Sequence, residues 1–396
     1  MTQIVRPFFD ACPLCGSTRA DSLLTLTDIP TNCHRLSLAG DEARAAPRGD
    51  LELVFCGQCE LLYNRRFEPG KLIYDSRYEN AQHFSPLFQK YITDLATELT
   101  ATHDLRNKTT LEIGCGDGRF LKLLCSEPAS CGIGYDPAGT DTPLADNIQI
   151  RTTTFDDQAC EPVHFAVSRH VLEHVRAPLD FLKSIHRCLE THNGTIYVEV
   201  PNADYMLQLS STWDLLYEHG LYFTSNALRY AMKHAGFEVL QIQECFGGQF
   251  LSAEGIATAG NDGRRHTFAG SEASVTDSLA NHAASFGSVV RKSIDRWSDE
   301  FRIWKERRIS VAIWGAGTKG IMFANQVDMA DNLAALVDVN PRKWHRYIPG
   351  AAIAISPPDD QALSDVQVVL VMNPIYETEI RQHFANAGWT AEFIVV

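Results

Sequence analysis

The chain has 396 residues and a formal net charge of −14, from 35 Lys and Arg against 49 Asp and Glu. At roughly 150 residues per domain, this length predicts two or three domains. The acidic excess argues against a general attraction to nucleic-acid phosphates or anionic lipids, so we expect no nucleic-acid partner. Hydrophobic residues make up 45% and charged residues 21%, a composition that excludes a fibrous or largely disordered chain.

The apolar segments are short. The run at 368–372 has the length of a strand, whereas a helix that spans a bilayer needs about 20 apolar residues. The first thirteen residues contain one Arg and lack the apolar core of a secretory signal. We therefore expect a soluble, cytoplasmic protein with no membrane partner, present as a monomer or a homodimer.

Four of the eleven cysteines form two pairs, Cys12-Pro-Leu-Cys15 and Cys56-Gly-Gln-Cys59. In a reducing compartment such paired spacing indicates metal binding before disulfides. Four thiolates suit a tetrahedral Zn²⁺ site without an open position, which is a structural site. The alternative is four unrelated buried thiols. His34, between the two pairs, is expected to be a loop residue and not a ligand.

The pattern then changes to a helix followed by alternating strands and helices. Apolar residues at every fourth position from Leu87 to Leu99 predict one helix with an apolar face. An α/β region continues to about residue 244 and predicts a mostly parallel sheet covered on both faces. A surface connection is expected at 257–274, a long helix at 275–305, and a second α/β series from 309 to the end. The predicted strands of the first series are 110–114, 132–135, 148–151, 165–168 and 194–199.

A glycine-rich loop joins the first predicted strand to a helix, as Glu112-Ile-Gly114-Cys-Gly116-Asp-Gly118. Glycines let the backbone approach a ligand closely, and a helix N-terminus supplies unpaired N–H groups. Asp136 ends the next strand, where a carboxylate can accept hydrogen bonds from both ribose hydroxyls. The pattern favours S-adenosylmethionine (SAM), with a dinucleotide as the alternative. Asp156 follows the third strand and is either a contact to the adenine amine or an exposed loop carboxylate.

Two further segments carry histidines. His170-Val-Leu-Glu173-His174 follows the fourth strand, where open α/β sheets place reacting groups. On a helix, His170 and His174 could bind a metal with Glu173 as a base, but no third ligand is evident. In the second segment, Tyr217-Glu218-His219-Gly-Leu-Tyr222, a Glu-His pair is flanked by aromatic residues. The alternative is a solvated pair with both tyrosines in the core.

The cysteine pairs, the glycine-rich loop and the two histidine segments are accompanied by two further motifs, Glu199-Val-Pro-Asn202 and Phe246-Gly-Gly-Gln-Phe-Leu. In their order along the chain they resemble the three-domain sugar C-methyltransferases of deoxysugar biosynthesis. Nearly the whole chain is covered, because Trp314-Gly-Ala-Gly-Thr-Lys319-Gly and Asn373 look like that family's C-terminal domain. The resemblance implies an α/β protein with an N-terminal zinc-binding domain at 1–72, a central class I SAM-methyltransferase Rossmann-like fold at 73–245, and a C-terminal Rossmann-like domain at 246–396.

Such an enzyme acts on a nucleotide-linked 4-keto sugar, and carbon becomes a nucleophile only after a proton next to the carbonyl is removed. By resemblance His219 is the base, His174 and Glu218 support it, and Tyr78 makes a further polar contact. The segment around Tyr74 and Tyr78 departs from the family pattern, which leaves the roles of the tyrosines open. The expected cofactor residues are Glu112, Gly114, Gly116, Gly118, Asp136, Asp156 and His170, and the expected substrate residues are Asn202, Tyr217, Tyr222, Lys319 and Asn373.

Alternative functions remain open from the sequence. The segment from Gly315 to Gly320 also fits the dinucleotide pattern G-x-G-x-x-G, with Asp338 eighteen residues further on. This favours an NAD-linked oxidoreductase or a non-catalytic scaffold. In the preferred interpretation, Lys319 and the loop amides face a substrate phosphate instead. An O- or N-methyltransferase acting on another small molecule is the remaining alternative.

Overall fold

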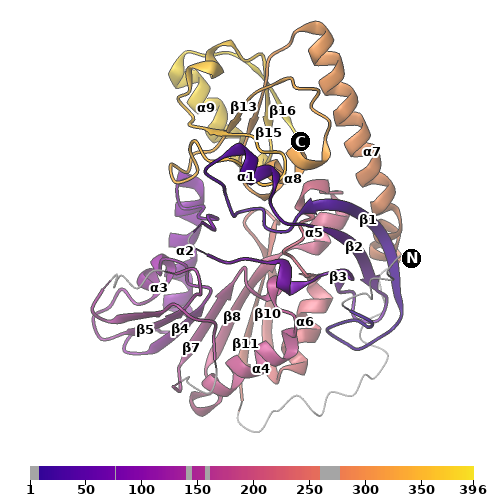
Figure 1. The fold of residues 1–396 in the computed structure, drawn as a ribbon. Helices are drawn as coiled ribbons and strands as arrows, with labels where there is room; N and C mark the ends of the chain where they lie inside the picture. Colours follow the sequence, from indigo (N-terminus) through magenta and orange to yellow (C-terminus); the bar gives the residue numbers. More distant parts are fainter. Residues whose placement is uncertain (1–8, 76, 140–144, 157–160, 259–276) are drawn as a thin grey trace.

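The computed structural model describes residues 9–75, 77–139, 145–156, 161–258 and 277–396. Three β-sheets organise this part of the chain, one for each predicted domain (Figure 1). The N-terminal sheet lies beside the central sheet, and the C-terminal sheet lies above both in that view. Helix α7 (Asp277–Arg307) runs along one side of the molecule, from the C-terminal sheet to strand β1 (Ala20–Pro30).

The N-terminal sheet has four antiparallel strands in the order β1-β2-β3-β9. Its last strand comes from far along the chain, because Leu62 pairs with Tyr222. The expected domain at 1–72 is therefore completed by a segment of the central region. The remaining strands are β2 (Arg48–Cys56), β3 (Leu62–Asn64) and β9 (Leu221–Tyr222).

The central sheet has the order β10-β11-β8-β7-β4-β5-β6, and the five strands from β8 to β6 are parallel. The strand order reverses between β4 and β7, which creates the crevice where open α/β sheets bind ligands. The predicted strands 110–114, 132–135, 148–151, 165–168 and 194–199 are confirmed within two residues at each end by β4 (Thr109–Ile113), β5 (Cys131–Tyr135), β6 (Ile148–Arg151), β7 (Phe165–Arg169) and β8 (Thr195–Pro201).

The expected boundary at 245/246 is wrong. Strands β10 (Phe237–Cys245) and β11 (Phe250–Ala257) form an antiparallel pair, and β11 also pairs with β8. The boundary would cut through the central sheet, because the turn that begins at Phe246 joins two neighbouring strands of that sheet. The expected surface connection at 257–274 lies almost wholly outside the described residues.

The C-terminal sheet is entirely parallel, in the order β14-β13-β12-β15-β16. Strands β12 and β15 are buried along their whole length, as expected for the apolar runs at 311–314 and 368–371. The strands are β12 (Val311–Trp314), β13 (Leu333–Val337), β14 (Ile355–Ser356), β15 (Val368–Val371) and β16 (Glu392–Val395).

Helices pack against the sheets, and two of them begin directly after the glycine-rich loops. These two are α3 (Arg119–Leu124) and α8 (Thr318–Gln326). The predicted helix at 87–99 is confirmed as α2 (Pro86–Thr102), whose first turn is capped by the Ser85 hydroxyl. The others are α1 (Gly40–Arg44), α4 (Pro178–Leu189), α5 (Ala203–Gln208), α6 (Ser225–His234) and α9 (Glu377–Ala387).

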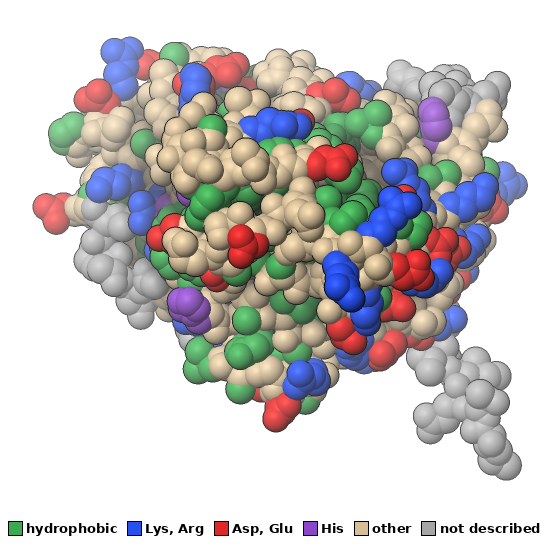
Figure 2. All heavy atoms as spheres, turned by 90° about the horizontal axis from the view of Figure 1, so that it is seen from above, with side chains coloured by type: hydrophobic (Ala, Val, Ile, Leu, Met, Phe, Trp, Pro, Cys, Tyr) green, Lys and Arg blue, Asp and Glu red, His purple; other side chains and the backbone are tan. Residues whose placement is uncertain are grey.

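The surface carries both acidic and basic side chains, as expected from the charged residues in the composition. On the face shown in Figure 2, acidic and basic side chains are interspersed. Within the described ranges, no helix combines the length and the apolar character that crossing a membrane would need.

Candidate functional site

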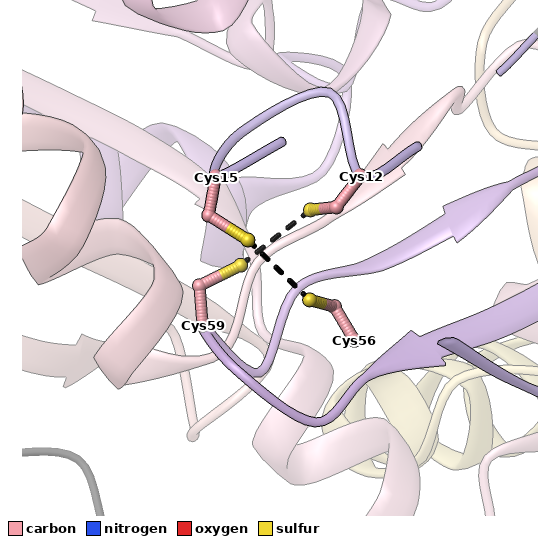
Figure 3. Close-up of side chains that lie close together, drawn as sticks. All are labelled: Cys12, Cys15, Cys56 and Cys59. Carbon is pink, nitrogen blue, oxygen red and sulfur yellow. Dashed lines mark hydrogen bonds between the residues drawn. The ribbon is translucent and has the colours of Figure 1, made fainter. Parts of the chain in front are cut away.

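The four paired cysteines converge on one point (Figure 3). The Cys12 and Cys59 sulfurs are 3.6 Å apart, and those of Cys15 and Cys56 are 3.5 Å apart. A tetrahedral Zn²⁺ with Zn–S bonds of about 2.3 Å requires sulfur separations of roughly 3.8 Å. The donor set and its spacing thus fit a structural zinc ion, which these four residues would hold.

The first glycine-rich loop lies at the carboxyl edge of the central sheet, between β4 and α3. Gly114 has a positive φ of 78°, and a Cβ added to it would lie 2.2 Å from the Val171 side chain. Only glycine fits there, because any side chain would clash with Val171 and would be strained at this φ. Val171 belongs to the His170–His174 segment that follows β7. The loop expected to bind the cofactor is thus in direct contact with the first histidine segment.

The carboxylate of Asp136, at the end of β5, holds this loop in place. Its oxygens accept hydrogen bonds from the backbone N–H groups of Gly116 and Ala138, both at 2.8 Å. Each oxygen keeps a second lone pair that a ribose hydroxyl can use. Glu112 is buried in β4, and burial raises its pKa to about 8. Asp156 is exposed on the loop after β6.

His170 directly follows β7 and has a left-handed conformation, with a φ of 54°. Its Nε2 lies 3.1 Å from a carboxylate oxygen of Glu199, which also pairs with Arg169 at 2.9 Å. The hydroxyls of Tyr91 and Tyr197 donate to the other oxygen of Glu199. Burial opposes protonation of His170, but Glu173 and Glu199 outweigh it and raise its pKa to about 9. His170 is thus a buried imidazolium in an ion-pair network.

A cavity of about 280 Å³ opens between the three sheets and is lined by residues from all three parts of the chain. It contains side chains from both histidine segments and from the loop before α8. The expected site residues that line it are Tyr78, His170, His174, Asn202, Glu218, His219, Tyr222, Lys319 and Asn373.

His174 and His219 face each other in this cavity, with ring centroids 4.8 Å apart. His174 is the last residue of the short 3₁₀ helix η3 (Leu172–His174), and His219 precedes β9. Burial, followed by the charges of His174 and His170, lowers the pKa of His219 well below its ordinary value. His219 is therefore a neutral imidazole at neutral pH.

The carboxylate of Glu218 accepts its hydrogen bonds from residues between 32 and 78 and not from His219. It accepts hydrogen bonds from the Cys33 backbone N–H at 3.1 Å and from the Tyr78 hydroxyl at 3.2 Å. Burial raises the pKa of Glu218. Glu218 thus acts on this part of the cavity by fixing the segment that carries Tyr78.

The expected substrate residues separate into two groups. Tyr222, Asn202, Lys319 and Asn373 line the cavity. The Tyr217 ring packs on Phe67 instead, and its hydroxyl accepts a hydrogen bond from the Glu68 backbone N–H at 3.0 Å. The expectation for Tyr217 is therefore wrong, because its side chain is buried against residues of the N-terminal sheet and is not part of the cavity lining.

The loop before α8 borders the same cavity. A Cβ added to Gly317 would meet no atom within 4 Å, so the backbone is accessible there. Lys319 donates to the carboxylate of Asp214 and to the Ser211 hydroxyl. Asp338, the acidic residue of the dinucleotide pattern, forms an ion pair of 2.9 Å with the buried Lys343.

His34 and Glu173 line the cavity although neither was among the predicted site residues. His34, expected to be an ordinary loop residue, lies 3.0 Å from the Thr318 hydroxyl, and burial lowers its pKa to about 3. No local pattern distinguishes it. Glu173 is buried in the cavity wall beside His174. The H-x-x-E-H spacing is the sequence signal that points to Glu173. It was not followed because the sequence showed no third metal ligand.

Comparisons with known proteins identify two domains. A methyltransferase domain model matches residues 82–242, and a model for the C-methyltransferase C-terminal domain matches residues 264–396. A search of curated proteins found no match to the chain. Together the two models cover both glycine-rich loops and both histidine segments, so the chain is a SAM-dependent methyltransferase.

Solved structures similar to the chain include several methyltransferases. The 1,6-didemethyltoxoflavin-N1-methyltransferase of Burkholderia thailandensis is 16% identical, with a TM-score of 0.34, over 44% of this chain and 81% of its own. A SAM-dependent methyltransferase from Aquifex aeolicus is 13% identical, with a TM-score of 0.35, over 48% of this chain and 100% of its own.

Proposed function

We propose that this methyltransferase transfers the methyl group of SAM to a carbon atom next to a carbonyl, in a small acceptor that is a nucleotide-linked keto sugar. The observation that carries the proposal is the position of the His174–His219 pair, in a cavity that the C-methyltransferase C-terminal domain closes. A carbon acceptor needs a base, whereas many oxygen and nitrogen acceptors are already nucleophilic.

His219 is the base in this proposal. Its lowered pKa keeps the imidazole neutral, so that a lone pair is free to accept a proton at neutral pH. The electron pair left on carbon then attacks the SAM methyl group, and the sulfur keeps the electrons of the broken bond. The Tyr78 hydroxyl lines the cavity and donates its one hydrogen to Glu218, so it would donate to the developing enolate oxygen only after leaving that bond.

The loop before α8 would bind the phosphates of the nucleotide. The N-terminus of a helix favours anions, because its first N–H groups have no partners within the helix. Gly317 allows a phosphate to approach the backbone, and Lys319 adds a positive charge at the cavity wall. Substrate phosphate would compete with Asp214 for the Lys319 ammonium group.

Deuterium exchange tests the base without methyl transfer. In D₂O with S-adenosylhomocysteine, the wild-type protein should exchange the proton next to the acceptor carbonyl. His219→Ala should abolish this exchange and lower turnover by roughly 10²–10⁴-fold, the usual contribution of a general base. The control is His192→Ala, because His192 stacks on His164 outside the cavity. Retained exchange in His219→Ala would contradict the assignment of the base.

A further inference from the structure

His34 lies in the cavity wall between the proposed base and the proposed phosphate loop. Its Nε2 is 3.0 Å from the hydroxyl of Thr318, the first residue of α8. It is also near enough to His219 to act on the pKa of that ring. His34 comes from the chain between the two cysteine pairs, whereas Thr318 belongs to the C-terminal domain. The proposed mechanism gives neither of the two a role.

The backbone around His34 is held firmly at this position. The Cys33 N–H donates to the buried Glu218 carboxylate at 3.1 Å. The His34 carbonyl accepts a hydrogen bond from the Glu79 N–H at 2.9 Å. The imidazole itself packs edge-on against the Tyr78 ring, with centroids 5.7 Å apart. These contacts fix the ring, so that Nε2 stays beside the start of α8.

The environment of His34 decides where its ring carries a hydrogen. Burial, followed by the charges of Lys343 and His174, lowers the pKa of His34 to about 3. The neutral ring therefore has one N–H group. Nδ1 is buried and has no hydrogen-bond partner within the described ranges, so a hydrogen there would be a buried donor without an acceptor. On Nε2 the same hydrogen is donated to the Thr318 hydroxyl oxygen.

This arrangement leaves the single hydroxyl hydrogen of Thr318 free for a ligand in the cavity. Gly317, which precedes Thr318, has no side chain to cap the first N–H groups of α8. Those groups and the helix dipole favour an anion. A hydroxyl that accepts a hydrogen bond also donates a stronger one, because bonds in a chain polarise each other.

We propose that His34 is a positioning residue for the acceptor, which donates to the Thr318 hydroxyl and directs the hydrogen of that hydroxyl to a nucleotide phosphate at the start of α8. The proposal rests on the proposed function and leaves the lone pair of the base, His219, untouched. No proton is transferred in this step. The N-terminal part of the chain thus takes part in acceptor recognition.

Calorimetry with inorganic pyrophosphate tests the pair in the full-length protein. Thr318→Val should weaken binding about 10–100-fold, the usual contribution of a hydrogen bond to a charged group. His34→Phe should weaken it about 3–10-fold, as for a neutral hydrogen bond, but should have no effect when Thr318→Val is already present. His34→Gln should bind like wild type, because its amide nitrogen can donate to the hydroxyl. The control is Thr93→Val, whose lost hydroxyl donates to the Gln89 carbonyl on α2, outside the cavity.

Three outcomes would overturn the proposal. They are a wild type that does not bind pyrophosphate, unchanged affinity in folded His34→Phe, and an equal effect of His34→Phe with and without the Thr318 hydroxyl. A further measurement uses the wild-type protein with ¹⁵N-labelled histidine and bound pyrophosphate. The ring resonances that are absent from His34→Gln should show the hydrogen on Nε2, and a hydrogen on Nδ1 would also overturn the proposal.

Turnover separates positioning from chemistry. With a nucleotide-linked keto sugar, His34→Phe should raise the KM about 3–10-fold and leave kcat unchanged, whereas a lowered kcat with an unchanged KM would contradict the proposal. The two proposals fail separately. A C-methylated product together with pyrophosphate binding that ignores both variants refutes the role of His34 alone. Pyrophosphate binding that responds to both variants, without any C-methylated product, refutes the proposed function alone.

Discussion

His170 should titrate far above an ordinary histidine. Its imidazolium lies between Glu199, at 3.1 Å, and Glu173, at 3.7 Å. Burial opposes the charge, but these carboxylates raise the folded pKa to about 9, against about 6.5 in an unfolded chain. A raised pKa stabilises the fold fully below pH 6.5, and the contribution disappears as the pH rises through 9. The difference corresponds to about 3 kcal/mol of unfolding free energy.

Two assays check this value. In NMR spectra of protein with ¹³C-labelled histidine, the resonance that is absent from His170→Gln should titrate near pH 9, in buffer without added divalent metal. In urea unfolding, the stability advantage of wild type over His170→Gln should shrink by about 3 kcal/mol as the pH rises from 6.5 to above 9. A midpoint near 6.5, or an equal pH dependence in both proteins, would refute the ion-pair reasoning.

Three further outcomes are expected. Cys56→Ser should lower the zinc content by one ion per chain in elemental analysis and destabilise the N-terminal sheet; unchanged zinc would exclude the four-cysteine site. Calorimetry should detect S-adenosylhomocysteine but not NADH at micromolar concentration, and Asp136→Ala should weaken that binding about 10–100-fold; preferential NADH binding would reverse the cofactor assignment. Gly320→Ala should cost about 1–3 kcal/mol of stability, because its Cβ would lie 1.9 Å from the Gly315 carbonyl oxygen. Gly317→Ala should fold normally and raise the KM for the acceptor; equal stability losses in the two glycine variants would contradict the packing of α8.

The local sequence pattern predicted where the strands lie better than it predicted which strands pair with each other. The predicted strand at 148–151 coincides with β6, because the alternation of apolar and polar residues in Ile148-Gln-Ile-Arg151 is visible within the strand itself. The pairing of β9 with β3 leaves no such signal, because Leu62 and Tyr222 are distant in the sequence. For the same reason the sequence could not show that β11 belongs to the central sheet.

The candidate site shows the same limit. Motif order identified both His174 and His219, and the structure brings their rings together. Nothing in the local sequence indicated that Tyr222 faces the cavity while Tyr217 packs on Phe67, because flanking an active segment does not fix the direction of a side chain. The proximity of Glu173 to His219 likewise leaves no signal in the local sequence, because the two residues come from distant segments.

The position of the transferred methyl group tests the central claim most directly. The protein is incubated with SAM that carries a ¹³C-labelled methyl group and with a panel of nucleotide-linked keto sugars, and the product is analysed by mass spectrometry and NMR. We predict a labelled methyl group bonded to the carbon next to the carbonyl. A label found only on oxygen or nitrogen, in acceptors that the protein demonstrably methylates, would contradict C-methylation and favour an O- or N-methyltransferase.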